Sequence, residues 1–328
     1  MAMTTEMECW TDGDEAVRDI PVRPLSPAAP EEPPKAARAS ALTVITPPTG
    51  AAVVDFAELW RFRDLLYFLA WRDVKVRYKQ TALGAAWAVL QPAMMMVVFT
   101  LFFARMAGVP SGDTPYPLFA YAGLLPWTFF ATAVAQAGNS VVGSERIITK
   151  VYFPRLAVPF AAVAASAVDF LVAVGLLAVM MAWYGVSPGP LVWLAPAVFL
   201  VILVAAAGVG TLLSALNVEY RDFRYVIPFL LQLWMFATPS VYMQLDAPPA
   251  PTAATATTAT SSPAGNPAVR AALALNPMTG LVASFRAATL GGPVPWGRLA
   301  GSSAASAALF VAGCLYFRKV EDRFADII

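Results

Sequence analysis

The chain has 328 residues, of which 59% are hydrophobic and only 13% are charged, and its formal net charge is +1. This composition excludes an ordinary soluble domain and indicates an integral membrane protein. Histidine is absent and only two cysteines occur, so we expect no metal cluster, no histidine proton shuttle and no cofactor bound by this chain.

The first 54 residues are acidic and rich in proline and alanine. They show no sustained apolar period, and no basic start is followed by an apolar core. The sequence therefore predicts a disordered tail and not a secretory signal peptide.

Residues 55–80 follow as a predicted amphipathic helix that lies flat at the membrane interface. Asp73 interrupts its apolar face, which indicates a local partner for this carboxylate. The apolar residues that share one helical face are Leu59, Phe62, Leu65, Leu66, Leu69 and Val76.

The remaining residues, 81–328, form a predicted all-α permease domain with six membrane-spanning helices. Each span is close to the roughly 20 residues that cross a hydrocarbon core of about 30 Å. The spans are expected at about 84–103, 117–138, 157–184, 191–216, 226–242 and 299–317.

The basic residues decide the orientation of these spans. With the N-terminus inside, 18 of the 22 Lys and Arg residues fall in inner segments and 4 fall in outer ones. The positive-inside rule therefore places both termini, and the connection between the second and third spans, in the cytoplasm.

That connection, residues 139–160, carries the charges Glu145, Arg146, Lys150 and Arg155 between two uncharged apolar runs. A short amphipathic helix is expected within residues 144–155, capped by Ser144. A solvated connector without a further role fits the same pattern. The expected helix places Ile147, Ile148, Val151 and Tyr152 at helical spacing, with Phe153 before Pro154 at its end.

Between Arg155 and Glu219 the sequence holds a single charge, Asp169, inside the third span. Burying an unpaired carboxylate at mid-membrane costs roughly 2.5–3.5 kcal/mol, so we expect a partner for it, in either a structural or a functional role. The next inner loop, residues 217–225, offers Arg221 and Asp222 either as a second contact or as charges that only fix the topology.

The outer connection before the last span has two parts. Residues 247–265 form a low-complexity insert rich in alanine and threonine, and residues 266–292 predict two short helices that dip back into the outer leaflet, a candidate outer gate. In the second helix Asn276 and Pro277 occupy the N-cap and first positions, Met278 begins the apolar face, and Gly291 follows its end.

The sequence lacks the residues that would couple transport to an energy source within this chain. A proton- or sodium-coupled carrier keeps several ionisable groups near the membrane midplane, whereas here only Asp169 qualifies. No G-x-x-x-x-G-K-[ST] loop and no catalytic triad or carboxylate cluster occurs in the spans. We therefore expect a transporter subunit that is not an enzyme and that is driven by another protein.

Several long stretches, in order, resemble the permease subunit of type-2 ABC exporters of polysaccharides, the family that exports O-antigen, capsule and teichoic-acid chains. The resemblance covers about residues 55–328. The stretches are RDVKVRYKQTALGAAWAVLQP (72–92), ERIITKVYFPRLAVP (145–159), LLSALNVEYRDFRYVIPFLLQLWMFATPSVY (212–242), LNPMTGL (275–281) and YFRKVEDRFADII (316–328).

This resemblance implies a homodimer in the inner membrane, assembled with two copies of an ATPase subunit that binds ATP and Mg²⁺, and a lipid-linked polysaccharide as cargo. It also implies that residues 145–155 are a coupling helix that docks on the ATPase, with Arg221 and Asp222 near the same interface, and that the helices around Asn276 are the outer gate. No nucleic acid partner is expected.

Aromatic residues line the channel in this family, and flat rings contact sugars without trapping a moving chain by charge. Aromatic belts at membrane interfaces are the alternative explanation for such residues at span ends. The candidates here are Trp127, Phe129, Phe130, Trp234 and Phe236.

Two features depart from the family pattern, namely the acidic tail and the insert at 247–265. A type-2 exporter of drugs or lipids is the second hypothesis for this chain. A membrane component of glycan assembly that works without ATP is the third.

Overall fold

The computed structural model describes residues 56–79, 86–102, 114–150, 153–238, 276–321, 323 and 324, all within one compact unit. The predicted tail, the insert at 247–265 and the first predicted outer helix lie outside the described residues. Throughout the described ranges the regular structure is helical, which confirms the all-α prediction.

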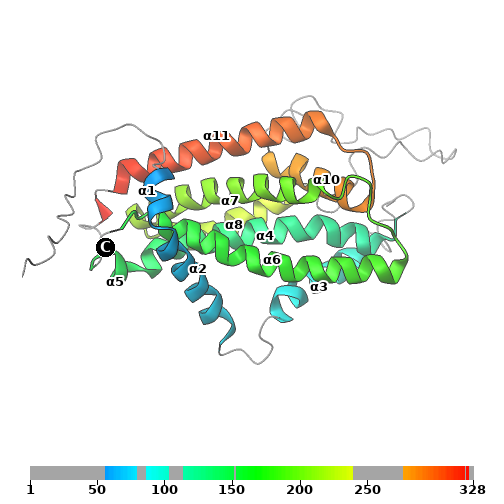
Figure 1. Ribbon diagram of the computed structural model, residues 1–328, viewed down its shortest axis with the longest axis horizontal. Helices are drawn as coiled ribbons and strands as arrows, with labels where there is room; N and C mark the ends of the chain where they lie inside the picture. Colours follow the sequence, from blue (N-terminus) through cyan, green and yellow to red (C-terminus); the bar gives the residue numbers. More distant parts are fainter. Residues whose placement is uncertain are drawn as a thin grey trace, which may run out of the picture. The chain divides into compact units, whose positions relative to one another are not determined.

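Four long helices that pack side by side form the body of the protein (Figure 1). They are α4 (Tyr116–Gly143), α6 (Ala157–Tyr184), α7 (Leu194–Glu219) and α11 (Trp296–Glu321). Each is 26 or 28 residues long and apolar enough to cross a bilayer. They correspond to the predicted second, third, fourth and sixth spans.

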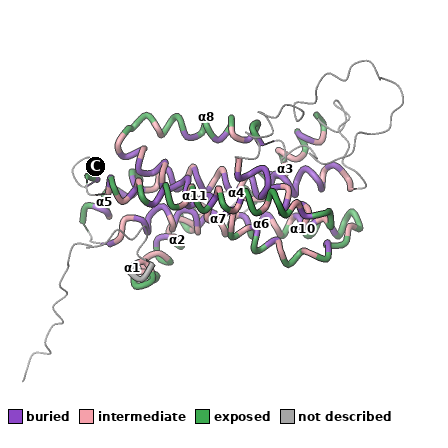
Figure 2. Tube along the Cα trace, turned by 90° about the horizontal axis from the view of Figure 1, so that it is seen from above, coloured by how far each residue is buried: buried purple, intermediate pink, exposed green. Residues whose placement is uncertain are grey.

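Two shorter apolar helices occupy the places of the predicted first and fifth spans. These are α3 (Ala86–Phe99), whose helical run continues to Phe102, and α8 (Phe223–Phe236). Both are shorter than the roughly 20 residues of a straight span, so the count of six spans stays a prediction. Much of α8 is exposed (Figure 2), although Ile227 and Leu231 pack against the core of the bundle.

The predicted interfacial helix is broken into α1 (Phe56–Arg61) and α2 (Arg63–Tyr78). Leu69 is buried against the bundle, and Leu59, Phe62 and Leu65 are partly buried beside it. Val76 lies seven residues after Leu69 on the same helical face, but it is 73% exposed. The last turns of α2 border an open groove, which Val76 lines together with Arg72, Asp73 and Arg77.

The carboxylate that interrupts the apolar face of α2 has the local partner that the sequence predicted. Arg72 donates two hydrogen bonds to Asp73, at 3.0 and 2.9 Å from Nε and Nη2 to the same carboxylate oxygen. The pair is partly buried on the side of α2 that faces the bundle.

The helix α10 (Pro277–Leu290) is buried along most of its length, and it packs against α4, α7 and α11. Gly291 ends it in the left-handed conformation, at φ 86°, as the sequence predicted. The backbone N–H of Gly189, in the connection between α6 and α7, donates to the carbonyl of Thr289 at 3.2 Å. The loop after α6 is therefore fastened to the end of α10.

Candidate coupling site

The loop between α4 and α6 contains one helical turn, α5 (Glu145–Ile148), instead of the longer helix expected within residues 144–155. Ser144 stands at the N-cap position, but its side chain makes no capping hydrogen bond. Ile147, Ile148 and Thr149 are β-branched, which disfavours continuation of the helix. The Thr149 hydroxyl donates to the carbonyl of Glu145 at 3.0 Å and closes the turn.

Two apolar residues of this loop, Ile148 and Phe153, face inward. Ile148 is 7% exposed and Phe153 is 5% exposed, and both belong to a buried cluster at the end of the bundle that carries α5. We call this end the α5 end and the cluster the α5-end cluster. Its buried members are Leu69, Val141, Ile148, Phe153, Leu156, Ala157, Val158, Ala161, Ala215, Val218, Phe317, Val320 and Phe324.

The α5-end cluster joins the loop to α2, α4, α6, α7, α11 and Phe324 in one packed unit. Because packed side chains transmit displacement with little compression, a push on the loop would reach these helices together. Ile148 and Phe153 thus support the loop from within and do not form its outer surface.

The charged residues of the loop divide into two groups. Glu145, Arg146 and Lys150 are exposed. Arg155 is partly buried, and its guanidinium donates to the backbone carbonyl of Glu321 at the end of α11, while its backbone N–H donates to the Glu321 side chain at 3.3 Å. Of the charged residues of this loop, the three exposed ones are therefore those available for the predicted contact with another subunit.

Three further residues of this loop were predicted to dock on the ATPase. Pro154 is partly exposed, and Ile147 is partly buried against the α5-end cluster. Tyr152 lies outside the described residues, so its predicted role stays a prediction.

The second loop lies between α7 and α8, and it exposes Arg221 and Asp222. Tyr316 of α11 donates to Glu219 at 2.8 Å, directly before this loop. Two residues earlier, the Asn217 amide donates to the carbonyl of Gly138 at 2.9 Å and to Asn139 at 3.2 Å. The structure thus brings the end of α7, and with it the second loop, to the last turns of α4 and α11.

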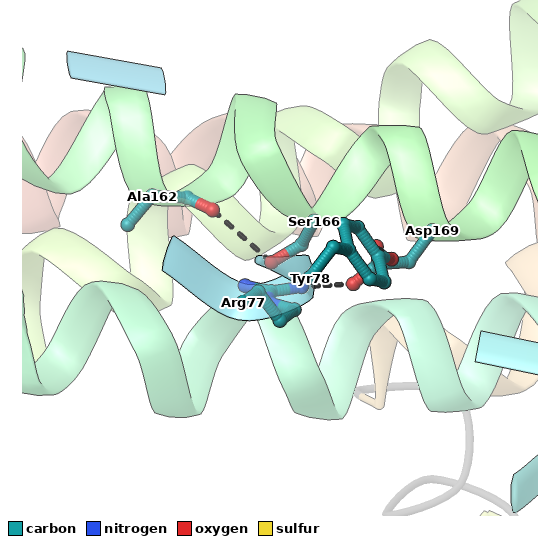
Figure 3. Close-up of polar contacts among 5 residues, drawn as sticks. All are labelled: Arg77, Tyr78, Ala162, Ser166 and Asp169. Carbon is teal, nitrogen blue, oxygen red and sulfur yellow. Dashed lines mark hydrogen bonds and ion pairs between the residues drawn. The ribbon is translucent and has the colours of Figure 1, made fainter. Parts of the chain in front are cut away.

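Asp169, the lone acid of the third predicted span, has two partners from α2 (Figure 3). The guanidinium of Arg77 forms an ion pair with it, and the hydroxyl of Tyr78 donates to its other oxygen. Burial, reinforced by the hydrogen bond to Asp169, raises the pKa of Tyr78 to about 12, so this hydroxyl stays protonated at neutral pH. The expected partner therefore exists.

Sequence reasoning missed Arg77 and Tyr78 because they lie 92 and 91 positions before Asp169. It also missed a polar stripe on α4, formed by Thr128, Thr132 and Gln136. The four-residue spacing of the stripe was a readable signal, since such residues share one helical face. All of these residues line one pocket with Asp169.

Three of the five predicted channel aromatics lie inside the chain. Trp127, Phe129 and Phe130 are at most 4% exposed. Phe130 contacts the Trp234 ring edge-on, with centroids 5.1 Å apart. Only Phe236 is largely exposed, at 58%. The channel role of these residues stays a prediction. Of the five, the exposed Phe236 and the partly buried Trp234 are the ones that a single chain presents at its surface.

Asn276 connects the predicted outer gate to α8. Its Oδ1 accepts from the backbone N–H of Met278 at 3.0 Å, which is the predicted N-cap bond, and from Trp234 Nε1 at 2.9 Å. Its Nδ2 donates to the carbonyl of Ala237 and the hydroxyl of Thr238 at 3.0 and 2.9 Å. One side chain thus fixes the start of α10, at Pro277, to the end of α8.

In the described part of the chain, no group of three or more Cys, Asp or Glu residues is arranged to hold a metal ion. Cys314 is buried in α11 as a free thiol.

Comparison with known proteins identifies the family of this chain. Residues 64–250 match the family model described as ABC-2 type transporter. The O-antigen export system permease protein RfbA of Myxococcus xanthus is 31% identical over 274 residues, covering 83% of this chain and 98% of that protein. The protein of the same name from Klebsiella pneumoniae is 26% identical over 266 residues, covering 81% and 95%. The chain therefore belongs to the ABC-2 type transporter family, as a membrane permease.

Proposed function

We propose that this chain is the permease of an ATP-driven exporter that moves a lipid-linked polysaccharide from the cytoplasm across the inner membrane. The observation that carries the proposal is the similarity to O-antigen export permeases along nearly their whole length. The sequence offers no phosphate-binding loop of its own, so the energy comes from a partner ATPase.

The coupling role of the α4–α6 loop follows from how it is held. Glu145, Arg146 and Lys150 are exposed, while Ile148 and Phe153 are packed among the ends of several helices. An ATPase that binds the exposed charges and moves on ATP binding would displace these helix ends as a unit. Arg221 and Asp222 form the second contact in this proposal.

The complete exporter contains two copies of the permease and two copies of the ATPase. Support for a second copy of the permease comes from α8, which exposes Phe229, Leu233 and Phe236 on the side opposite its buried residues. The pathway runs between the two copies and uses the aromatic side chains of α8, with the α8–α10 junction at Asn276 as its outer gate.

Both termini face the cytoplasm in this account. The support is the distribution of basic residues, of which 18 fall on the inner side and 4 on the outer side of the proposed topology. The α5 end of the bundle is then the cytoplasmic end, where a soluble ATPase can reach it.

Deletion of the gene, followed by gel analysis of the surface polysaccharide and of lipid-linked glycan inside the cell, tests the proposal. Loss at the surface with accumulation inside, both reversed by the intact gene, is the expected result. An unchanged envelope would contradict it and favour an exporter of drugs or lipids. If deletion removes the surface polysaccharide, but the permease purified from the intact strain carries no ATPase, the results would favour a component of glycan assembly that works without ATP.

A further inference from the structure

A pocket of about 320 Å³, lined by apolar side chains with a set of polar ones among them, lies between α2, α3, α4 and α6. It contains the ion pair of Arg77 and Asp169, and the roles proposed for the two loops and for α8 do not use it. Its volume is within the range of small-molecule sites, about 300–1,000 Å³. We call it the α2–α6 pocket.

One wall of the pocket is the polar stripe of α4. Thr128, Thr132 and Gln136 follow one another at four-residue spacing, in a helix whose other residues are mostly apolar. Polar side chains in a membrane-spanning helix are costly unless they meet polar groups or water. The Thr128 hydroxyl donates to the carbonyl of Leu125 at 3.0 Å within α4, so Thr132 and Gln136 are the members of the stripe that can bind polar content in the pocket.

The charges in the pocket are balanced. Arg77 is bound to Asp169, which also accepts from the Tyr78 hydroxyl. An incoming anion would meet an arginine that is already engaged and a carboxylate that repels it. A neutral ligand rich in hydroxyl groups avoids this repulsion, because it can donate to the remaining lone pairs of Asp169 and exchange hydrogen bonds with amides.

The pocket also contains a flat apolar surface. Trp87, in the first turn of α3, is 50% exposed and lines the pocket together with Gln91 one turn later. An indole face adjacent to amide, hydroxyl and carboxylate groups suits a sugar ring, which has apolar C–H faces and a polar rim.

A second pocket, of about 340 Å³, shares Arg77 and Gln136 with the first. It extends along α4 past Asn139 and Ser140 to Ser144, at the start of α5. Polar side chains of α2 and α4 thus recur in both pockets, from Asp169 to the start of the coupling loop.

We propose that the α2–α6 pocket binds a neutral sugar residue of the transported glycan, with Trp87 against the ring face and Gln91, Thr132, Gln136 and Asp169 around its hydroxyl groups. This assignment rests on the proposed export of a polysaccharide. It adds a glycan site within each chain, on the side of α4 that faces α2 and α6.

Photocrosslinking in cells tests the proposal directly. The full-length chain carries p-benzoyl-phenylalanine at position 87, with position 183 as the control, because Trp183 is 85% exposed and does not line the pocket. A permease adduct that stains for oxidised glycan at position 87 and not at 183 is expected. Adducts that contain phospholipid and no glycan at position 87 would overturn the proposal in favour of a lipid site.

A second measurement uses export rates. Thr132→Val removes one hydroxyl from the pocket with little change in shape, and export of the glycan should fall about fivefold, the equivalent of one lost hydrogen bond. Ser303→Ala removes a hydroxyl from α11 outside the pocket and should leave export unchanged. Equal export by both variants would contradict the sugar site.

The two proposals fail in distinguishable ways. If deletion of the gene abolishes surface polysaccharide while position 87 captures no glycan, the export function stands and the pocket assignment falls. If deletion leaves the envelope unchanged, the export function itself fails.

Discussion

Arg77 of α2 forms an ion pair with Asp169 of α6, and the side chains of the two residues are only 25% and 19% exposed. Asp169 is the thirteenth residue of α6, which places it roughly 18 Å along that helix from its first residue. The last turn of α2 thus reaches a point near the middle of α6. This contact makes α2 part of the helical body and forms one wall of the α2–α6 pocket.

Asp169→Leu leaves the charge of Arg77 without its partner, and we expect a loss of about 2–3 kcal/mol, below the 3–5 kcal/mol of fully buried pairs. Replacing both residues, as Arg77→Met with Asp169→Leu, should recover much of that loss, since no unpaired charge remains. Thermal unfolding of the purified permease in detergent measures both. A double variant less stable than Asp169→Leu alone would contradict the pairing.

Reversal of two exposed charges tests the coupling loop. Arg146→Glu combined with Lys150→Glu should reduce the amount of copurifying ATPase by about tenfold or more, because the proposed docking of these two cations requires acidic residues on the ATPase, and those would repel the introduced glutamates. The permease itself should remain at its normal level in the membrane. Arg298→Glu, at the opposite end of α11 from the α5-end cluster, is the matched control. Normal ATPase recovery with the double variant would exclude docking through these charges.

Ile148 should behave differently from its charged neighbours, because it is buried. Ile148→Asp places an unpaired carboxylate in the α5-end cluster, and it should lower the amount of folded protein by costing several kcal/mol. Ile148→Val should cost only about 1 kcal/mol and preserve ATPase binding. Fluorescence-detected size-exclusion chromatography reports both outcomes. Full recovery of folded Ile148→Asp protein would mean that this side chain is accessible.

Gly313 of α11 lies against the backbone of α7. A Cβ atom there would overlap the carbonyl oxygen of Gly208, so Gly313→Ala should lower the free energy of unfolding by about 1–3 kcal/mol. Gly301→Ala on the same helix is the control, since a Cβ at that position has no neighbour within 4 Å. Equal melting temperatures of the two variants would show that α7 and α11 are not packed this closely.

Asn276 offers a graded test of the α8–α10 junction. Asn276→Ala removes its N-cap bond and all its side-chain contacts, and it should cost at least about 1 kcal/mol. Asn276→Asp keeps the acceptor for Met278 and Trp234 but loses the donor to Ala237, so its stability should be intermediate. Thermal unfolding establishes the order. An aspartate variant less stable than the alanine variant would contradict it.

Local signals in the sequence predicted local structure well. The N-cap at Asn276 and the end of α10 at Gly291 depend on neighbouring residues, and the structure confirms them. The four long helices lie where spans were predicted, although the ends of three of them differ from the predicted bounds by up to five residues. The helix expected within residues 144–155 is a single turn, α5, and the β-branched residues that disfavour its continuation were a local signal that the prediction overlooked. The burial of Ile148 in the α5-end cluster was not predictable locally, because it depends on helices far along the chain.

The contacts between helices could not be predicted from the sequence, for a physical reason. In an apolar membrane helix the side facing lipid and the side facing the core have similar compositions, so the burial of Trp127 and Phe130 left no periodic signal. The need of Asp169 for a partner was predictable from its cost in the membrane. The identity of Arg77 as that partner depends on how α2 crosses α6.

The most direct test of the account is transport into inside-out membrane vesicles that contain this chain and its ATPase. Labelled lipid-linked glycan should become resistant to added glycosidase only when ATP is present. Vesicles with Arg146→Glu and Lys150→Glu should show no such protection. Protection that is equal without ATP, or in vesicles lacking this chain, would contradict the claim that it is the permease of an ATP-driven polysaccharide exporter.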